Sequence, residues 1–307
     1  MKTSQALVIR HGSLGDVILT CPVIQTLTRN GFQVTLAVRE VWGKLLVSLG
    51  CGSNLLPLDS QFFLPCYQEG FPQAPELKEK LSPFQLILSF THPDEPFSQR
   101  LTQLAVVPPL FHPVPTTSLR SHLIDYLLEP LKKRFDLIET LPKLSLPSSH
   151  PYYLVIHPGS GSRSKNWPAE NFSHLVENLK KVRPIRILLG PAEKQAESFW
   201  KNFLPRPEII LSDDPGQLLK VFQSARLFIG NDSGVTHLAA ALGVKTLAIF
   251  GPTDPTIWGP RGRWVRLLSS KISCQPCLPG LTRPTCFQEC LRKITVEQVL
   301  KEVENLW

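Results

Sequence analysis

The chain has 307 residues, of which 42% are hydrophobic, 19% charged and 8% aromatic. This composition is typical of a folded protein with a sizeable core and excludes intrinsic disorder and a collagen-like architecture, and the length favours two domains. Lys and Arg total 33 against 25 Asp and Glu, a net charge of +8 that favours anionic partners such as nucleotides, nucleic acid or acidic lipid.

No apolar run of about 18 residues occurs, and the first twenty residues include Arg10, His11 and Asp16. The sequence therefore predicts neither a membrane span nor a signal peptide, and a cytoplasmic location. The seven cysteines are an odd number, and Cys21 and Cys51 stand singly. A disulfide framework is not expected.

In the first half, strands are predicted at 6–10, 33–38 and 84–90. Helices are predicted at 17–29, closed by Asn30 and Gly31, and at 121–135. The proline-rich stretch between the second and third strands predicts long loops with one short helix.

The stretch 141–151 contains three prolines and three serines without apolar periodicity, and it predicts the linker between domains 1–147 and 148–307. After it, the predicted strands are 152–157, 185–190, 227–230 and 246–250, and the predicted helices are 169–181, 192–203, 217–225, 235–242 and 296–306. This alternation is typical of βαβ units. The expected fold class is α/β, with two Rossmann-like domains whose parallel sheets face a central cleft and bind ligands at the carboxyl ends of their strands.

The first loop that contains candidate functional residues runs from Arg10 to Asp16, between a strand and a helix. Two glycines and a serine there allow a tight turn. Asp16 is suited to cap the helix, which stabilises it by about 0.5 to 2 kcal/mol. It is equally suited to act as a general base for a hydroxyl.

The second loop runs from His157 to Pro168, again between a strand and a helix. Its glycines, serines, Arg163 and Lys165 have the composition of a phosphate site, although the Walker A spacing is not matched. The alternative is a surface loop with solvated charges.

The third motif runs from Gly230 to His237. Amides of Ser233 and Gly234 at a helix start are suited to bind a pyrophosphate, and Asp232 to accept hydrogen bonds from sugar hydroxyls. The alternative is a capping aspartate with a core histidine at His237.

A last cluster comprises Cys274, Cys277, Cys286 and Cys290. The spacing is compatible with a structural zinc ion, and free thiols or a disulfide are the alternatives. A structural metal there would brace the C-terminal loop, with no catalytic role implied.

Taken together, these motifs resemble glycosyltransferase family 9, the ADP-heptose:lipopolysaccharide heptosyltransferases, over nearly the full chain. Residues 13–17 are similar to its Ser-x-Gly-Asp element, and 157–160 with Lys165, Trp167 and Pro168 to its Gly-Ser and Lys-x-Trp-Pro elements. Asn231 to Gly234 with His237, and then residues 250–255, resemble its most recognisable block. The four cysteines resemble those of some members.

The resemblance implies a GT-B fold, with the acceptor bound mainly by the first domain and the nucleotide-sugar donor by the second. It implies inverting transfer without a catalytic metal. Asp16 would be the general base, in an acceptor-side loop with Ser13 and Gly15. On the donor side, Lys165 and Ser160 would hold the pyrophosphate, Glu193 the ribose, Asp232 the donor sugar, and Ser233, Gly234 and His237 the phosphates.

The predicted function is therefore transfer of a heptose from ADP-heptose to the inner core of lipopolysaccharide. The partners would be an acidic glycolipid and the inner face of the inner membrane, to which basic residues are attracted by about 1 kcal/mol each, and not nucleic acid. Candidate contacts are Arg39, Arg100, Arg120, Lys132, Lys133 and Arg134. Alternatives are a family 9 transferase using another nucleotide sugar, a nucleotide-sugar 2-epimerase of the same fold, and a non-catalytic nucleotide-sugar-binding subunit.

Overall fold

A computed structural model describes residues 4–68, 74–115, 119–146, 151–201, 207–212, 214–277 and 286–307. The chain divides into two compact units, here called unit 1 (residues 1–119 and 123–144) and unit 2 (residues 120–122 and 145–307). The boundary expected between 147 and 148 falls within residues 147–150, outside the described residues.

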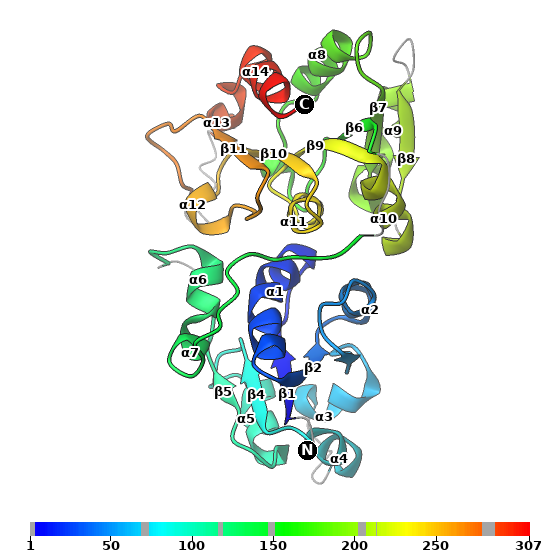
Figure 1. The fold of residues 1–307 in the computed structure, drawn as a ribbon. Coiled ribbons are helices and arrows are strands. Elements are labelled where there is room, and N and C mark those ends of the chain that lie inside the picture. Colours follow the sequence, from blue (N-terminus) through cyan, green and yellow to red (C-terminus); the bar gives the residue numbers. More distant parts are fainter. Residues whose placement is uncertain are drawn as a thin grey trace. The chain divides into compact units, whose positions relative to one another are not determined.

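Unit 1 is built on a five-stranded parallel sheet of order β3-β2-β1-β4-β5 (Figure 1). Its strands are β1 (Ser4–Ile9), β2 (Phe32–Ala37), β3 (Asn54–Leu55), β4 (Leu86–Ser89) and β5 (Leu110–Phe111). The central strand β1 is an apolar run because helices and loops cover both faces of a parallel sheet. The predicted strands at 6–10, 33–38 and 84–90 are present, whereas the two-residue strands β3 and β5 were not predicted.

Among the described residues, the longest helix of unit 1 is α1 (Leu14–Arg29), which ends before Asn30 as predicted but begins three residues earlier than predicted. The predicted helix 121–135 is wrong as one element, because it is broken into two short helices around Leu128 and Pro130. The other helices that the described residues form are α2 (Glu40–Ser48), η1 (Gln61–Phe63), α3 (Leu64–Tyr67), α4 (Pro75–Leu81), α5 (Pro96–Leu104), α6 (Leu123–Leu127) and α7 (Glu129–Lys132).

Unit 2 contains a six-stranded parallel sheet of order β11-β10-β9-β6-β7-β8 (Figure 1). Its strands are β6 (Tyr153–His157), β7 (Ile185–Leu189), β8 (Glu208–Leu211), β9 (Ala225–Asn231), β10 (Lys245–Phe250) and β11 (Val265–Ser269). The four inner strands were predicted. The two edge strands were not, because they are only partly buried and lack a continuous apolar run.

The helices of unit 2 pack against this sheet around a core that includes Trp167, Phe172 and Trp200. Their bounds are η2 (Arg163–Lys165), α8 (Ala169–Leu179), η3 (Pro191–Ala196), α9 (Glu197–Lys201), α10 (Pro215–Ser224), α11 (Gly234–Ala241), α12 (Pro255–Trp258), α13 (Glu289–Arg292) and α14 (Val296–Leu306). The predicted helix 192–203 is instead the 3-10 turn η3 followed by α9, and its last two residues lie outside the described residues.

Both sheets are parallel, so the predicted α/β class is confirmed. Within the described residues, no helix is long and apolar enough to cross a membrane.

Candidate functional site

The three loops singled out in the sequence each follow the carboxyl end of a parallel strand. The Arg10 to Asp16 loop follows β1 in unit 1. The His157 to Pro168 loop follows β6, and the Asn231 to His237 segment follows β9, both in unit 2. Because ligands of open α/β sheets bind at this edge, each unit presents a candidate site there.

In unit 1, Asp16 lies in the first turn of α1, where its carboxylate accepts three hydrogen bonds. Its Oδ2 accepts from the Ser13 backbone N and the Ser13 Oγ, both at 2.8 Å. Its Oδ1 pairs with Arg10 Nη2 at 3.1 Å, and 31% of the side chain stays exposed. The capping interpretation is therefore correct for Asp16, and its exposed fraction leaves a role as base open. Gly15 is buried in the same turn.

Arg10 is the buried partner of Asp16. Its side chain is 8% exposed, and its guanidinium carbon lies 6.0 Å from the centre of the Phe90 ring. Burial lowers the pKa of Arg10, while the charge of Asp16 opposes this shift. The Arg10 Nε is buried without a hydrogen-bond partner among the described residues. Arg10 thus fixes one oxygen of Asp16 from inside unit 1, a role that the sequence reasoning did not assign.

A cavity of about 770 Å³ lies beside Phe90, at the ends of β4 and β5. Its lining includes the polar side chains of His92, Asp94, Glu95 and Tyr126. Tyr126 donates a hydrogen bond to the Pro113 carbonyl at 2.6 Å and so holds one wall of the cavity. This volume is within the usual range of small-molecule sites, about 300 to 1,000 Å³.

A substitution at Gly12 tests whether the position of the Asp16 carboxylate depends on the backbone of this loop. Gly12 has a φ of +128°, and a Cβ added there would lie 2.6 Å from Asp16 Oδ2. We expect Gly12→Ala to displace the Asp16 carboxylate and to destabilise the protein by about 1 to 3 kcal/mol, measured by urea unfolding. Gly31→Ala is the matched control, because Gly31 also has a positive φ (+87°) but no atom within 4 Å of its added Cβ. The Gly12 variant should therefore lose more stability than the Gly31 variant, and equal losses in the two variants would contradict this reading.

In unit 2, the ends of β9 and β10 and the loop after β6 meet at Asp232. Lys165 Nζ lies 2.7 Å from Asp232 Oδ2, and Thr253 Oγ1 donates to the same oxygen at 2.6 Å. The Asp232 side chain is 7% exposed, whereas that of Lys165 is 32% exposed. Two residues predicted for the donor site are thus brought together, and Thr253 is a third member that had no predicted role.

The loop after β6 is tied to β9 by Asn231, which is fully buried. The Asn231 side chain donates to the Pro158 carbonyl at 2.8 Å and accepts from the Trp167 backbone N at 2.9 Å. Within the loop, Ser160 Oγ contacts the Ser162 carbonyl and Asn166 Oδ1, both at 2.6 Å. The hydroxyl of Ser160 therefore orders its own loop, and a phosphate would have to exchange with these partners.

Glu193 lies against the strand end at His157. Its Oε2 accepts from the Gly190 backbone N at 2.9 Å and lies 3.7 Å from His157 Nε2. Burial raises the pKa of Glu193, but the His157 interaction and the backbone amides outweigh it, so the net shift is downward. Gly159 packs here too closely for a side chain, since its added Cβ would lie 2.1 Å from Glu193 Cδ.

The lowered pKa of Glu193 predicts a pH-dependent contribution to stability. A carboxyl whose folded pKa is depressed stabilises the protein above its unfolded pKa and loses this contribution as pH falls through the folded pKa. We expect Glu193→Gln to lower the free energy of unfolding by about 1 to 2 kcal/mol at neutral pH. This difference should shrink below the ordinary glutamate pKa of 4.5.

Urea unfolding at several pH values measures this difference. The control is Glu177→Gln, because Glu177 is 48% exposed and its ion pair with Lys180 joins two residues three positions apart on α8. A Glu193 effect that is independent of pH would contradict the assignment.

The helix α11 begins directly after Ser233, whose Oγ accepts from the Thr236 backbone N at 3.3 Å. Gly234 is the first residue of the helix. His237 is buried and has an interaction partner within the protein, which favours the core-histidine alternative for its side chain. The start of α11 therefore lies next to Asp232, at the carboxyl edge of the sheet.

The four C-terminal cysteines are free thiols. Burial, followed by the neighbouring thiols of Cys277, Cys286 and Cys274, raises the pKa of Cys290 to about 11. In the part of the chain that the structure describes, no group of three or more His, Cys, Asp or Glu is placed to hold a metal ion. Residues 278–285, which connect Cys277 to Cys286, lie outside that part.

A comparison with known protein families shows to which family this chain belongs. The model of glycosyltransferase family 9 (heptosyltransferase) matches residues 112–286, more than half of the chain. The chain belongs to glycosyltransferase family 9. The family resemblance inferred from the sequence motifs is thereby confirmed.

Individual family 9 proteins match parts of the chain. Lipopolysaccharide heptosyltransferase 1 of Pseudomonas aeruginosa is 33% identical over 130 residues, 42% of this chain and 36% of that protein. Lipooligosaccharide heptosyltransferase 2 of Campylobacter jejuni is 30% identical over 161 residues, half of each chain. The matched stretch thus spans half or less of the length of these curated relatives.

Among solved family 9 structures, the E. coli heptosyltransferase WaaC superposes with a TM-score of 0.74 at 17% identity, covering 99% of this chain and all of that one. This similarity confirms the predicted GT-B fold.

Proposed function

We propose that this family 9 protein is an inverting glycosyltransferase that moves a heptosyl group from ADP-heptose to an inner-core sugar of lipopolysaccharide. The observation that carries the proposal is the Lys165, Asp232 and Thr253 cluster at the carboxyl edge of unit 2, in a chain of the heptosyltransferase family. The structure of E. coli WaaC, to which this chain is similar, contains ADP, and this supports adenine as the base of the donor nucleotide.

The donor would bind in unit 2. Its pyrophosphate would bind to the Lys165 ammonium, to Ser160 and to the backbone amides of Ser233 and Gly234. His237 would lie nearby. Glu193 would contact the ribose. Once the ammonium turns to the phosphate, Asp232 is released to accept a hydrogen bond from a hydroxyl of the donor sugar.

The acceptor would bind in unit 1, with Asp16 as the general base in the loop that holds Ser13 and Gly15. Asp16 takes the proton of the acceptor hydroxyl as that oxygen attacks the anomeric carbon. One oxygen–carbon bond forms and the bond from that carbon to the phosphate oxygen breaks, so the electron pair and negative charge leave with ADP. A single displacement of this kind inverts the anomeric configuration.

The reaction is proposed to need no cofactor and no catalytic metal. A metal ion in such reactions serves to neutralise the leaving diphosphate. Lys165 supplies a positive charge at the same place. Its partner Asp232 is 7% exposed, so this charge lies at the edge of the protein interior. Electrostatic stabilisation of the leaving diphosphate is stronger there than in water.

The acceptor is proposed to be an acidic glycolipid at the inner face of the inner membrane, reached by a cytoplasmic, peripheral enzyme without nucleic-acid partners. The net charge of +8 supports this proposal, because basic residues near an anionic surface are attracted to it. Binding that weakens steeply with salt would be the expected signature.

Calorimetric titration of the protein with ADP, UDP, GDP and CDP in the presence of a chelator tests the donor. We expect the protein to bind ADP most tightly. Tighter binding of another nucleotide would indicate a transferase that uses a different sugar donor. Incubation with ADP-heptose and inner-core glycolipid should then yield a longer glycolipid and ADP. Release of free epimerised sugar without an acceptor would instead favour the epimerase.

A further inference from the structure

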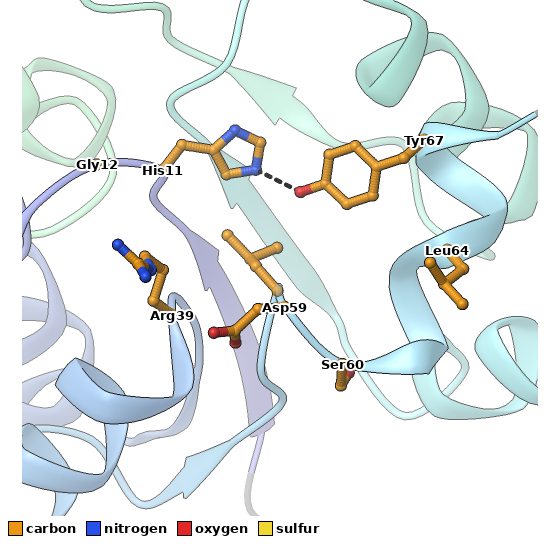
Figure 2. Close-up of a pocket in the computed structure, with 8 residues that line it drawn as sticks. His11, Gly12, Arg39, Asp59, Ser60, Leu64 and Tyr67 are labelled. Atoms are coloured by element: carbon orange, nitrogen blue, oxygen red, sulfur yellow. Dashed lines mark hydrogen bonds between the residues drawn. The ribbon is translucent and has the colours of Figure 1, made fainter.

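Unit 1 contains a cavity of about 400 Å³ that the mechanism above does not use. It opens where β1, β2 and β3 end, and residues after each of these strands line it (Figure 2). The lining residues are His11, Gly12, Arg39, Leu58, Asp59, Ser60, Leu64 and Tyr67. The volume is within the range of sites that hold a small ligand.

One wall of this cavity is aromatic and is held in place by neighbouring rings. The Tyr67 hydroxyl lies 3.2 Å from His11 Nε2, and this hydrogen bond is drawn in Figure 2. His11 meets the Phe97 ring edge-on at a centroid distance of 4.9 Å, and Tyr67 packs on the same ring at 5.1 Å. Burial lowers the pKa of His11, which favours the neutral ring. Tyr67 nevertheless remains 51% exposed, so the protein covers only half of this residue.

The opposite part of the cavity carries two charged side chains. Asp59 Oδ1 accepts from the Glu40 backbone N at 2.8 Å, which holds the start of α2 and the adjoining Arg39 beside the cavity (Figure 2). Arg39 is exposed, and within the described ranges its guanidinium has no ion-pair partner. The cavity thus offers guanidinium donors and a carboxylate acceptor together.

The cavity also adjoins Asp16. Gly12 lines it, and a Cβ on Gly12 would lie 2.6 Å from Asp16 Oδ2. Gly12 is therefore next to both this cavity and the carboxylate proposed as the base.

We propose that this cavity binds a pyranose ring of the acceptor, with the ring against Tyr67 and His11 and its hydroxyls between Arg39 and Asp59. A sugar ring has an apolar face for an aromatic side chain and hydroxyls that both donate and accept hydrogen bonds, and the cavity presents partners for both. The assignment deepens the proposed function and rests on it, because it names what unit 1 holds while Asp16 acts.

The first test is the steady-state kinetics of Tyr67→Ala and Arg39→Ala with inner-core glycolipid as the varied acceptor. Each should raise the acceptor KM by about tenfold, or about 1.4 kcal/mol, with the donor KM unchanged. Tyr67→Phe keeps the ring and should stay close to the wild type. Matched controls are Tyr152→Ala, which removes another exposed tyrosine, and Arg266→Ala, which removes an exposed arginine on β11.

A binding measurement without turnover separates failure of this assignment from failure of the proposed function. Saturation-transfer NMR with methyl α-mannopyranoside needs neither donor nor catalysis. A signal from the wild type and both controls that is lost in Tyr67→Ala and Arg39→Ala supports the sugar site, even if no heptose is transferred. Equal signals from wild type and both cavity variants, or no signal from the wild type, would overturn it, whatever the transferase activity.

Discussion

Asp16→Ala is expected to reduce transfer by about 10²- to 10⁴-fold, the usual contribution of a positioned general base. Asp16 belongs to unit 1, whereas the residues proposed for the donor belong to unit 2. Binding of ADP to the variant should therefore stay within a few fold of the wild type. Initial rates at saturating donor, together with calorimetric titration of ADP, measure the two quantities separately.

Asp16→Asn is the informative companion of this variant. Asn can still accept hydrogen bonds from Ser13, so the start of α1 is preserved, but it cannot take a proton. Asp16→Ala also removes the partner of the buried Arg10 and should unfold at a lower temperature. If the Asn variant keeps wild-type activity, or if ADP binding falls as much as the rate does, Asp16 is not the base.

Lys165→Met is expected to weaken ADP binding by about 30- to 4,000-fold, because loss of a charged partner at such a site costs about 2 to 5 kcal/mol. In the free protein, Lys165 neutralises Asp232, whose side chain is 7% exposed. The variant leaves that carboxylate without its cation and close to the pyrophosphate, so repulsion adds to the lost attraction. Calorimetric titration with ADP measures the change.

Two further variants sharpen this prediction. Lys220→Met removes an exposed lysine of α10 and should bind ADP as the wild type does. Adding Asp232→Asn to Lys165→Met removes the orphaned charge, so the double variant should be more stable than Lys165→Met alone. Unchanged ADP affinity in Lys165→Met would refute the pyrophosphate assignment.

The inner strands and long helices could be predicted from local sequence. β1 and β10 are apolar runs, and α1 ends at Asn30 and Gly31, where Gly31 takes a positive φ. The edge strand β11 was missed because Arg266 and Leu267 are exposed, and strand formation there follows from pairing with β10.

For the candidate sites, local sequence was enough to predict three loops at the carboxyl ends of strands and to name Asp16, Lys165 and Asp232. Residue type and position after an apolar run are sufficient for that. Which side chains meet could be seen only in the folded protein: Lys165 pairs with Asp232, 67 positions later, and His157 with Glu193. The physical reason is strand order, because β6 lies between β9 and β7 in the sheet although β7 precedes β9 in the chain. Likewise, Arg39 follows β2, Asp59 follows β3 and Tyr67 ends α3, and these residues form one cavity because β1, β2 and β3 are neighbours in the sheet.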